Sequence, residues 1–315
     1  MKKIVLCFML LIVGLFVVSC DLGGTTENPD DKKVSIIMPT GTPALGLAEY
    51  AVDAKEDENI TIDIVAGSDP LMAAFVNKSY NVIVAPVNLG AKMFKQYEEY
   101  VLYSTFVWGN LYIASKQQIN SFEDLDGKTV VAFGKNSTPD IVMQALLKHH
   151  KDINVTLEYV SDVSEANTLL AGNQDKIIVT AEPSISKLKS KFNLSIIDLQ
   201  EEWAKMTGND SYPQAGIFVQ KDALKNKYVK NELSKMKQSV LNSIKNPQVC
   251  AEKAVAMHTS FETLGKEVLA SAIPNCHYQI IENEKEAVNY YLQMMMELGF
   301  GKQMGESLPK DEFFA

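Results

Sequence analysis

Two kinds of apolar segment take turns along this chain. Short apolar runs predict β-strands; most are nearly continuous, and the run at residues 60–65 alternates with polar residues. Between them lie segments whose apolar residues recur every three or four positions, as expected of amphipathic helices. Strands alternating with helices are typical of a parallel-rich α/β fold. The strands predicted from these runs cover residues 34–38, 60–65, 81–85, 101–107, 111–114, 129–133, 155–160, 176–180, 194–199 and 215–220.

Prolines mark the points at which several of these strands pass into helices. Proline suits the first helical turn, where its missing N–H would have no partner. The small polar residues before it are good N-caps, and we predict this role for Thr42 and Thr138. Ligands of open α/β sheets bind beyond the carboxyl ends of the strands. We therefore expect one crevice to be lined by the turns that contain Pro43, Pro70, Pro86, Pro139 and Pro183.

The clearest of these turns lies within residues 121–150. A strand at 129–133 follows the turn Asp126-Gly127, and the small polar residues 134–138 then lead into a helix. Unpaired backbone N–H groups at a helix start favour a small polar or anionic group. We expect this turn to share its ligand with residues 40–43 across the crevice, so that neither turn binds well alone.

The order of the elements predicts two lobes. Residues 34–115 begin the first lobe, residues 116–211 form the second, and residues 212–315, which are mostly helical, return to the first. Two crossovers between the lobes imply a hinge and a cleft. Near these crossovers stand two large aromatic residues, Trp108 and Tyr212, which are candidates to line the cleft.

The first twenty residues have the order of a secretory signal. Two lysines precede the apolar run 4–18, which is shorter than the roughly 18 residues of a membrane-spanning helix. Residues 17–20, Val-Val-Ser-Cys, resemble a bacterial lipoprotein cleavage box. Residues 1–20 are therefore predicted to be a signal peptide with a lipidated Cys20; an ordinary signal or a membrane anchor is the alternative. Residues 21–33 are polar and predict a flexible tether.

Composition narrows the choice of ligand and partner. The formal charge of −9 makes nucleic acid an unfavourable partner. All 30 basic residues are Lys, so an anion would be held by backbone N–H groups, hydroxyls or Lys rather than by the bidentate Arg fork. Outside the signal segment the cysteines are Cys250 and Cys276, which either form a disulfide or remain two buried thiols.

The sequence lacks the common motifs of catalysis and metal binding. Gly127-Lys128-Thr129 resembles the end of a phosphate-binding P-loop, but Phe122 stands where that motif requires glycine. The sequence contains no nucleophile elbow, no zinc-protease helix and no paired-cysteine motif. His149-His150 is expected to close a helix, where imidazolium complements the helix dipole. We therefore predict that the protein is not an enzyme and holds no metal or cofactor.

Several segments together carry a resemblance to a known family. They are residues 38–44 (Met-Pro-Thr-Gly-Thr-Pro-Ala), 80–86 (Tyr-Asn-Val-Ile-Val-Ala-Pro), 122–128 with 134–139, 173–183, 212–213 and 308–314. This chain resembles the substrate-binding lipoproteins of ABC importers, in the nitrate, sulfonate and taurine group with its thiamine-precursor-binding relatives. It departs from them at Asn81, where relatives often have Asp. The resemblance implies the type 2 periplasmic-binding-protein fold, an α/β fold of two lobes, each a sheet flanked by helices, joined by two hinge crossovers.

The resemblance also implies a function and a site. We expect an extracytoplasmic, lipid-anchored monomer that captures a small molecule between its lobes and delivers it to an ABC permease and its ATPase. The ligand would be a heterocyclic vitamin precursor or a small sulfonate-like anion. An enzyme of the thiamine-precursor-synthase type, or a ligand-sensing receptor module, is the alternative. The resemblance places the ligand contacts at Thr40, Gly41, Thr42, Ser68, Pro86, Asn88, Ser137, Thr138 and Glu182.

Overall fold

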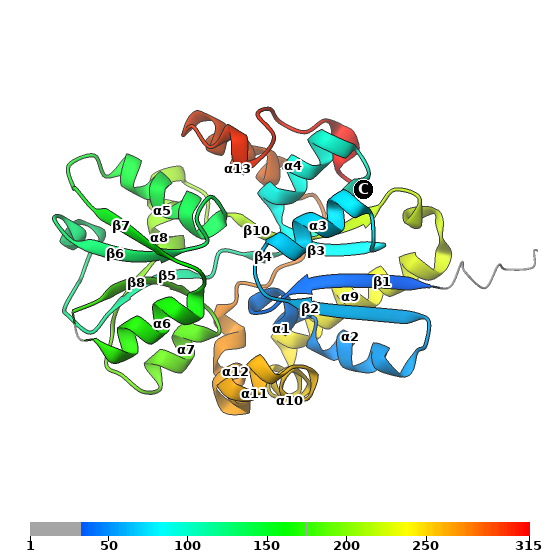
Figure 1. The fold of residues 1–315 in the computed structure, drawn as a ribbon, viewed down its shortest axis with the longest axis horizontal. Helices are drawn as coiled ribbons and strands as arrows, with labels where there is room; N and C mark the ends of the chain where they lie inside the picture. The colour runs from blue at the N-terminus through cyan, green and yellow to red at the C-terminus, as the bar shows by residue number, and fades with distance from the viewer. Residues whose placement is uncertain (1–32, 174) are drawn as a thin grey trace, which may run out of the picture.

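The computed structural model describes residues 33–173 and 175–315 (Figure 1). The predicted signal peptide, Cys20 and all but the last residue of the predicted tether lie outside this part of the chain. Within the described residues the strands form two five-stranded sheets, each flanked by helices, as the sequence predicts. No helix in these ranges is both long enough and apolar enough to cross a membrane.

The first sheet has the strand order β2-β1-β3-β10-β4. Its parallel strands are β1 (Val34–Pro39), β2 (Ile60–Val65) and β3 (Val82–Pro86). The long strand β10 (Pro213–Gln220) runs antiparallel to both β3 and β4 (Tyr100–Trp108). The chain therefore leaves the first sheet after β4 and returns to it as β10, as the two predicted crossovers require.

The second sheet has the strand order β7-β6-β8-β5-β9. In it, β6 (Thr129–Phe133) pairs in parallel with β7 (Thr156–Val160) and β8 (Ile177–Ala181). Strand β5 (Leu111–Ser115), which we predicted in the first lobe, instead pairs antiparallel with β8 and with β9 (Ser195–Asp198). The predicted boundary between the lobes at residue 115 is therefore wrong: the chain passes from the first sheet to the second between β4 and β5, after Trp108. An apolar run carries no information about which sheet completes its hydrogen bonds.

Both faces of the first sheet are buried at its inner strands, which explains why β1 and β3 are almost continuously apolar, whereas the edge strand β2 alternates and exposes Thr61 and Asp63. Ile37 of β1 packs in one hydrophobic cluster, whereas its neighbours Ile36 and Met38 pack in the other. One face is covered by α3 (Asp69–Asn77) and α4 (Val87–Tyr97). The opposite face is covered by α1 (Thr42–Gly46), α2 (Ala48–Asp53), α9 (Lys227–Lys245) and α10 (Pro247–Met257).

Helices also cover both faces of the second sheet. One face packs against α5 (Thr138–His149) and α8 (Leu199–Thr207), and the other against α6 (Val163–Gly172) and α7 (Ser184–Lys189). The remaining α-helices of the described residues are α11 (Thr259–Leu264), α12 (Lys266–Ala272) and α13 (Lys285–Glu297). Helix α13 joins the lobes, because Tyr291 packs against Trp203 of α8 at a centroid distance of 5.9 Å.

Two helix starts differ from our prediction by one residue. Gly41 and Ser137, rather than Thr42 and Thr138, occupy the N-cap positions of α1 and α5. Both threonines are the first residues of their helices instead, and their hydroxyls are free to bond across the molecule. The two cysteines are free and buried: the thiol of Cys250 donates to the Leu45 carbonyl, and that of Cys276 to the Ala272 carbonyl.

Candidate functional site

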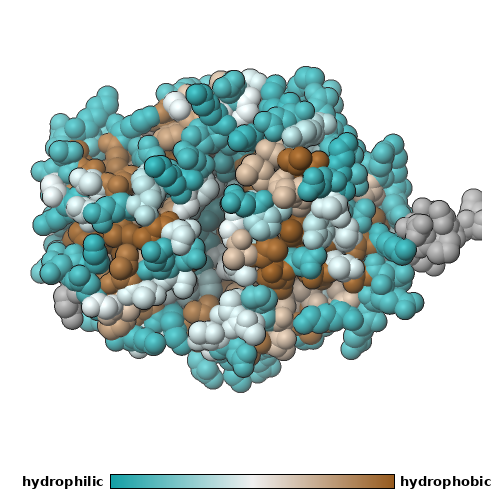
Figure 2. All heavy atoms as spheres, viewed as in Figure 1, coloured by the Kyte–Doolittle hydropathy of each residue, from teal (hydrophilic) through white to brown (hydrophobic). Residues whose placement is uncertain are grey.

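Parallel strands of both sheets end at the border between the lobes. Because β1 and β2 are in register from Val34 to Pro39, their carboxyl ends lie at one edge of the first sheet. In the second sheet, β6 and β8 likewise run in parallel and end before the turns that hold Ser137 and Glu182. Figure 2 shows a groove that runs between the two lobes. The predicted site residues thus follow the strand ends on its two sides.

Thr42 is a point of direct contact between the lobes. Its hydroxyl donates to the backbone carbonyl of Glu182 at 2.6 Å and accepts a hydrogen bond from Nδ2 of Asn110, also at 2.6 Å. The Tyr278 hydroxyl donates to the Thr42 carbonyl at 2.6 Å. Asn110 and Tyr278 were not predicted. Asn110 lies in the crossover between β4 and β5 with a positive φ of 86°, and the Gly109-Asn110 pair was the only local signal for it.

A second contact joins Thr138 to Asn88. The Thr138 hydroxyl donates to Oδ1 of Asn88 at 3.2 Å, and Nδ2 of Asn88 donates to the Gln303 carbonyl, also at 3.2 Å. Both Thr138 and Asn88 are buried. We expected the turn of Thr138 to face residues 40–43, and this pairing is wrong: Thr138 meets the start of α4, and Thr42 meets Glu182.

Glu182 is a buried carboxyl group at this border. It is 4% exposed, and burial raises the pKa of its carboxyl to about 7, against a smaller lowering effect of its bond with Ser186. Oε1 accepts a hydrogen bond from Ser186 Oγ at 3.0 Å. Within the described residues, Oε2 of Glu182 and Oδ1 of Asn110 complete no hydrogen bond of good geometry, although the Asn275 side chain lies close enough to the Glu182 carboxyl to lower its pKa. Two acceptors without a well-aligned donor therefore lie on residues that both bond to Thr42.

For five other predicted residues at the strand ends, the described part of the chain shows no side-chain hydrogen bond across the border. Gly41 has a φ of 86°, a conformation that favours glycine and sets the turn before α1. The Ser137 hydroxyl donates to the Gly134 carbonyl at 2.6 Å, so it shapes its own turn. Each of these residues is partly exposed: Thr40, Gly41, Ser68, Pro86 and Ser137.

The two aromatic candidates take part in packing. Tyr212 is fully buried, donates to Oε1 of Gln200 at 2.8 Å, and packs on Trp203 at a centroid distance of 5.0 Å. Trp108 is 4% exposed, and its indole N–H donates to the Gln279 carbonyl at 3.1 Å. Among the described residues, neither side chain forms a hydrogen bond with Thr42, Glu182, Asn88 or Thr138. They support the crossovers instead.

Removal of the Thr138 hydroxyl tests the second contact. Thr138→Val keeps the shape of the side chain, but Oδ1 of Asn88 loses its donor. We therefore expect the arrangement in which the two lobes are in contact to be destabilised by about 1 kcal/mol, and ligand affinity to fall about fivefold. Calorimetric titration and thermal unfolding measure the two effects. The matched control is Thr168→Val, which removes a hydroxyl bonded within α6. Equal affinities of Thr138→Val and the control would contradict the role of this contact.

Comparison with known proteins assigns the family. A family model described as "Menaquinone biosynthesis" matches residues 71–297. The chain belongs to this family. The matched region runs from α3 to the end of α13 and so includes Asn88, Asn110, Thr138 and Glu182. A search of curated proteins finds no match.

Solved structures of transport proteins share the fold. An ABC transporter from Parabacteroides distasonis superposes with a TM-score of 0.73 at 18% identity, covering 90% of this chain and 99% of its own. The periplasmic aliphatic sulphonate binding protein of Escherichia coli gives 0.67 at 12% identity, covering 89% and 93%. The alkanesulfonate-binding protein of Xanthomonas axonopodis pv. citri, solved with MOPS bound, gives 0.62 at 12%, covering 89% and 95%. The fold is that of type 2 periplasmic binding proteins, as predicted.

Proposed function

We propose that this protein is an extracytoplasmic solute-binding lipoprotein that captures a small molecule between its two lobes. The observation that carries the proposal is the pair of contacts across the border, Thr42 with Glu182 and Thr138 with Asn88. Each contact joins groups at strand ends in different lobes, so both form only when the lobes are together. A ligand that bridges the same groups would be enclosed by closure around the crossovers.

The unsatisfied acceptors favour a ligand that donates hydrogen bonds. Among the described residues, Oδ1 of Asn110 is a buried acceptor without a partner, and Oε2 of Glu182 is a buried acceptor with only a poorly aligned donor, the Asn275 side chain, nearby. A sulfonate offers only acceptors, so it would leave Oδ1 of Asn110 unpaired at a cost of about 1–3 kcal/mol, and it would pair with Glu182 only while that carboxyl is protonated. A heterocycle that carries N–H or amino groups would satisfy them. We therefore favour a heterocyclic vitamin precursor over a sulfonate-like anion, although the sulphonate-binding proteins share the fold.

Delivery to a membrane permease is the second part of the proposal. A monomeric receptor of this fold would hand its ligand to an ABC permease driven by a separate ATPase, and would take part in no chemistry itself. The family is described by a biosynthetic pathway, that of menaquinone, so the experiment has to distinguish binding of the ligand from its conversion into a product. Native mass spectrometry of freshly purified protein would identify a carried ligand. We expect the ligand to be recovered unchanged after prolonged incubation; its conversion into a product would instead support the enzyme alternative.

The lipid anchor can be tested at Cys20. If this thiol carries the lipid, Cys20→Ala removes the attachment point, and most of the protein should move from the membrane fraction to the soluble extracytoplasmic fraction. Fractionation followed by immunoblotting measures this shift. Cys250→Ala is the control, since that thiol lies buried against Leu45. Membrane association that is unchanged in Cys20→Ala would contradict the proposed anchor.

A further inference from the structure

Two lysine side chains of the second lobe bind the ends of helices that follow β10 in the chain. Nζ of Lys187, on α7, donates at 2.8 Å to the carbonyl of Leu264, the last residue of α11. Nζ of Lys148, on α5, donates to the carbonyl of Leu298, which caps α13. Each contact therefore joins the second lobe to the part of the chain that returns to the first.

The two contacts lie on different sides of the border between the lobes. Helices α5 and α13 pack in the same hydrophobic cluster as α3 and α4, whereas α11 packs through Phe261 in the cluster on the opposite face of the first sheet. Figure 1 shows α13 on one side of the border and α11 on the other. A rotation that separates the lobes on either side therefore breaks the lysine contact on that side.

The two acceptors share the same local structure. The last carbonyls of a helix have no partner within the helix and carry the negative end of its dipole. Gly265 follows Leu264 with a φ of 88°, and Gly299 follows Leu298 with a φ of 85°, so the chain turns away directly after each carbonyl. A lysine ammonium group complements such a helix end in both charge and hydrogen bonding.

The Lys148 contact crosses a gap between the lobes. Beside it, a cavity of about 680 Å³ separates α5 and α8 from α13, and its lining includes Met206 of α8 and Met294 of α13. The packing of Tyr291 on Trp203 lies about 10 Å further back along α13 and is apolar and buried. We expect this packing to persist as a pivot, while the exposed Lys148 contact opens and closes.

The lysines on the two sides would act as a pair. We propose that Lys148 and Lys187 are latches that hold the two lobes together when no small molecule is bound. Each latch consists of one flexible side chain and one helix end, so it opens without disrupting a hydrophobic core. The consequence for solute capture, that a bound molecule leaves only after both latches have opened, rests on the proposed function. The arrangement of the lobes does not, and it is measured without any ligand.

Small-angle X-ray scattering of the purified protein tests the latches. The reference protein and all variants carry Cys20→Ala, so that the lipid anchor proposed above does not attach them to membranes. In Lys148→Met with Lys187→Met, each side chain keeps its apolar stem but loses its ammonium group. We expect the radius of gyration to increase by about 0.5 Å or more from the roughly 20 Å of a compact chain of this length. An unchanged radius in the double variant would overturn the proposal.

A conservative variant separates the latches from other effects of the substitutions. Lys148→Arg with Lys187→Arg keeps a cation that donates N–H groups, and should keep the radius of the reference protein. Circular dichroism shows whether each variant retains its helices. The two single methionine variants should each give a smaller increase in radius than the double variant, and they carry the test if the double variant unfolds. An expansion of the arginine variant equal to that of the methionine variant would contradict the latches.

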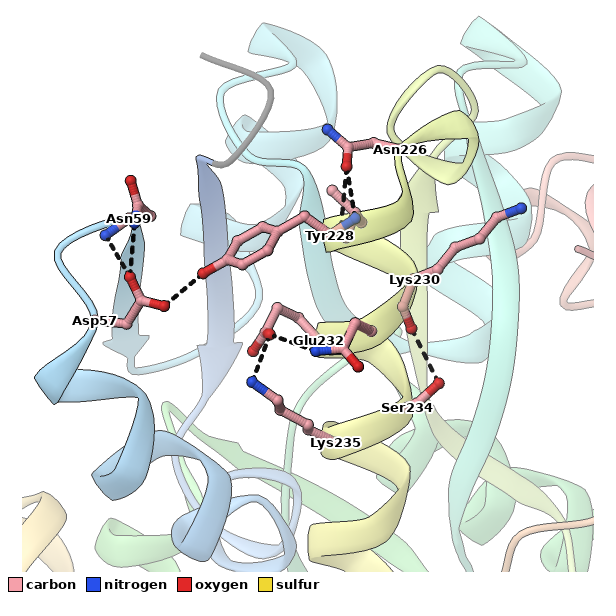
Figure 3. Close-up of polar contacts among 10 residues, drawn as sticks. Asp57, Asn59, Asn226, Tyr228, Lys230, Glu232, Ser234 and Lys235 are labelled. Carbon is pink, nitrogen blue, oxygen red and sulfur yellow. Dashed lines mark hydrogen bonds and ion pairs between the residues drawn. The ribbon is translucent and has the colours of Figure 1, made fainter. Parts of the chain in front are cut away.

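Two further lysines provide matched controls. Nζ of Lys116 donates to the Ala171 carbonyl of α6 at 2.8 Å and lies 4.2 Å from the centroid of the Phe192 ring, entirely within the second lobe. Lys230 is exposed on α9, and Figure 3 shows its ammonium group directed away from the neighbouring acidic side chains. Lys116→Met and Lys230→Met should leave the radius of gyration unchanged. An increase in either control equal to that in Lys148→Met would show a general effect of lost charge and overturn the proposal.

Discussion

The Glu182→Gln variant is expected to bind the ligand of the interlobe crevice about ten- to a hundredfold more weakly than the wild-type protein. Glutamine keeps the shape of the side chain, but an amide oxygen is a weaker acceptor than a carboxylate. The loss of a charge-assisted hydrogen bond is worth about 1.5–3 kcal/mol. Calorimetric titration with the ligand identified by mass spectrometry measures the change. An unchanged affinity would contradict both the position of the ligand and our preference for a hydrogen-bond donor.

The same variant should change how stability depends on pH. The pKa of Glu182 is raised in the folded protein from 4.5 to about 7, so between these values the folded state binds more protons than the unfolded state. The contribution of Glu182 to the stability of the folded state is therefore complete below pH 4.5, declines as the pH rises toward 7, and is lost above that value. The full difference is about 3 kcal/mol. Glu182→Gln should remove this decline, as measured by chemical unfolding at pH 4.5, 6 and 8.

Glu284 provides the matched control for these measurements. Its carboxyl is also buried, and burial raises its pKa to about 7. Its Oε2 accepts a hydrogen bond from the backbone N–H of Thr105 at 2.6 Å, away from the predicted ligand contacts. Glu284→Gln should remove a pH-dependent contribution of the same sign while leaving ligand affinity unchanged. A loss of affinity in Glu284→Gln equal to that in Glu182→Gln would show that the effect is one of general stability.

The Gly90→Ala variant is expected to lower the free energy of unfolding strongly. Gly90 lies in α4 directly against Phe218 of β10, and an added Cβ would fall inside the fully buried aromatic ring. Phe218 cannot move aside easily, because its ring also contacts Phe75 at a centroid distance of 5.6 Å. Overpacking of this kind costs about 3 kcal/mol or more. Urea unfolding measures the change in the free energy of unfolding.

Two further variants make this test specific. Gly172→Ala replaces a glycine at the end of α6 where a Cβ would meet no described atom within 4 Å, so we expect it to be neutral or slightly stabilising. Phe218→Leu replaces the ring with a smaller side chain and so makes room for the Cβ that Gly90→Ala adds. The double variant should therefore be more stable than the sum of the two single changes predicts. Strict additivity would contradict a steric origin of the effect.

The repeating strand-to-helix units could be predicted because their causes are local. Buried strands such as β1 are continuously apolar and helices such as α4 are periodic, and both patterns follow from which faces meet the core. The strand ends then indicate where polar residues gather. For this reason Thr42, Asn88, Thr138 and Glu182 could be named from the sequence, and the structure brings them together in two pairs.

The pairing of these residues could not be predicted. All five proline-containing turns have similar chemistry, and only the strand orders β2-β1-β3-β10-β4 and β7-β6-β8-β5-β9 decide which of them meet. For the same reason the sheet to which β5 belongs, and the contacts of Asn110 and Tyr278 with Thr42, were missed. These contacts join residues 68 and 236 positions apart in the chain.

The sequence by itself determined the fold class, the strand ends and the kinds of residue that gather at the border between the lobes, because periodicity and turn chemistry act over a few residues. Only the tertiary structure decided which groups remain unsatisfied. Whether Oε2 of Glu182 finds a well-aligned donor depends on every element packed around it. A glutamate in a turn looks ordinary in the sequence, and its burial at the border between the lobes makes Glu182 a candidate ligand contact.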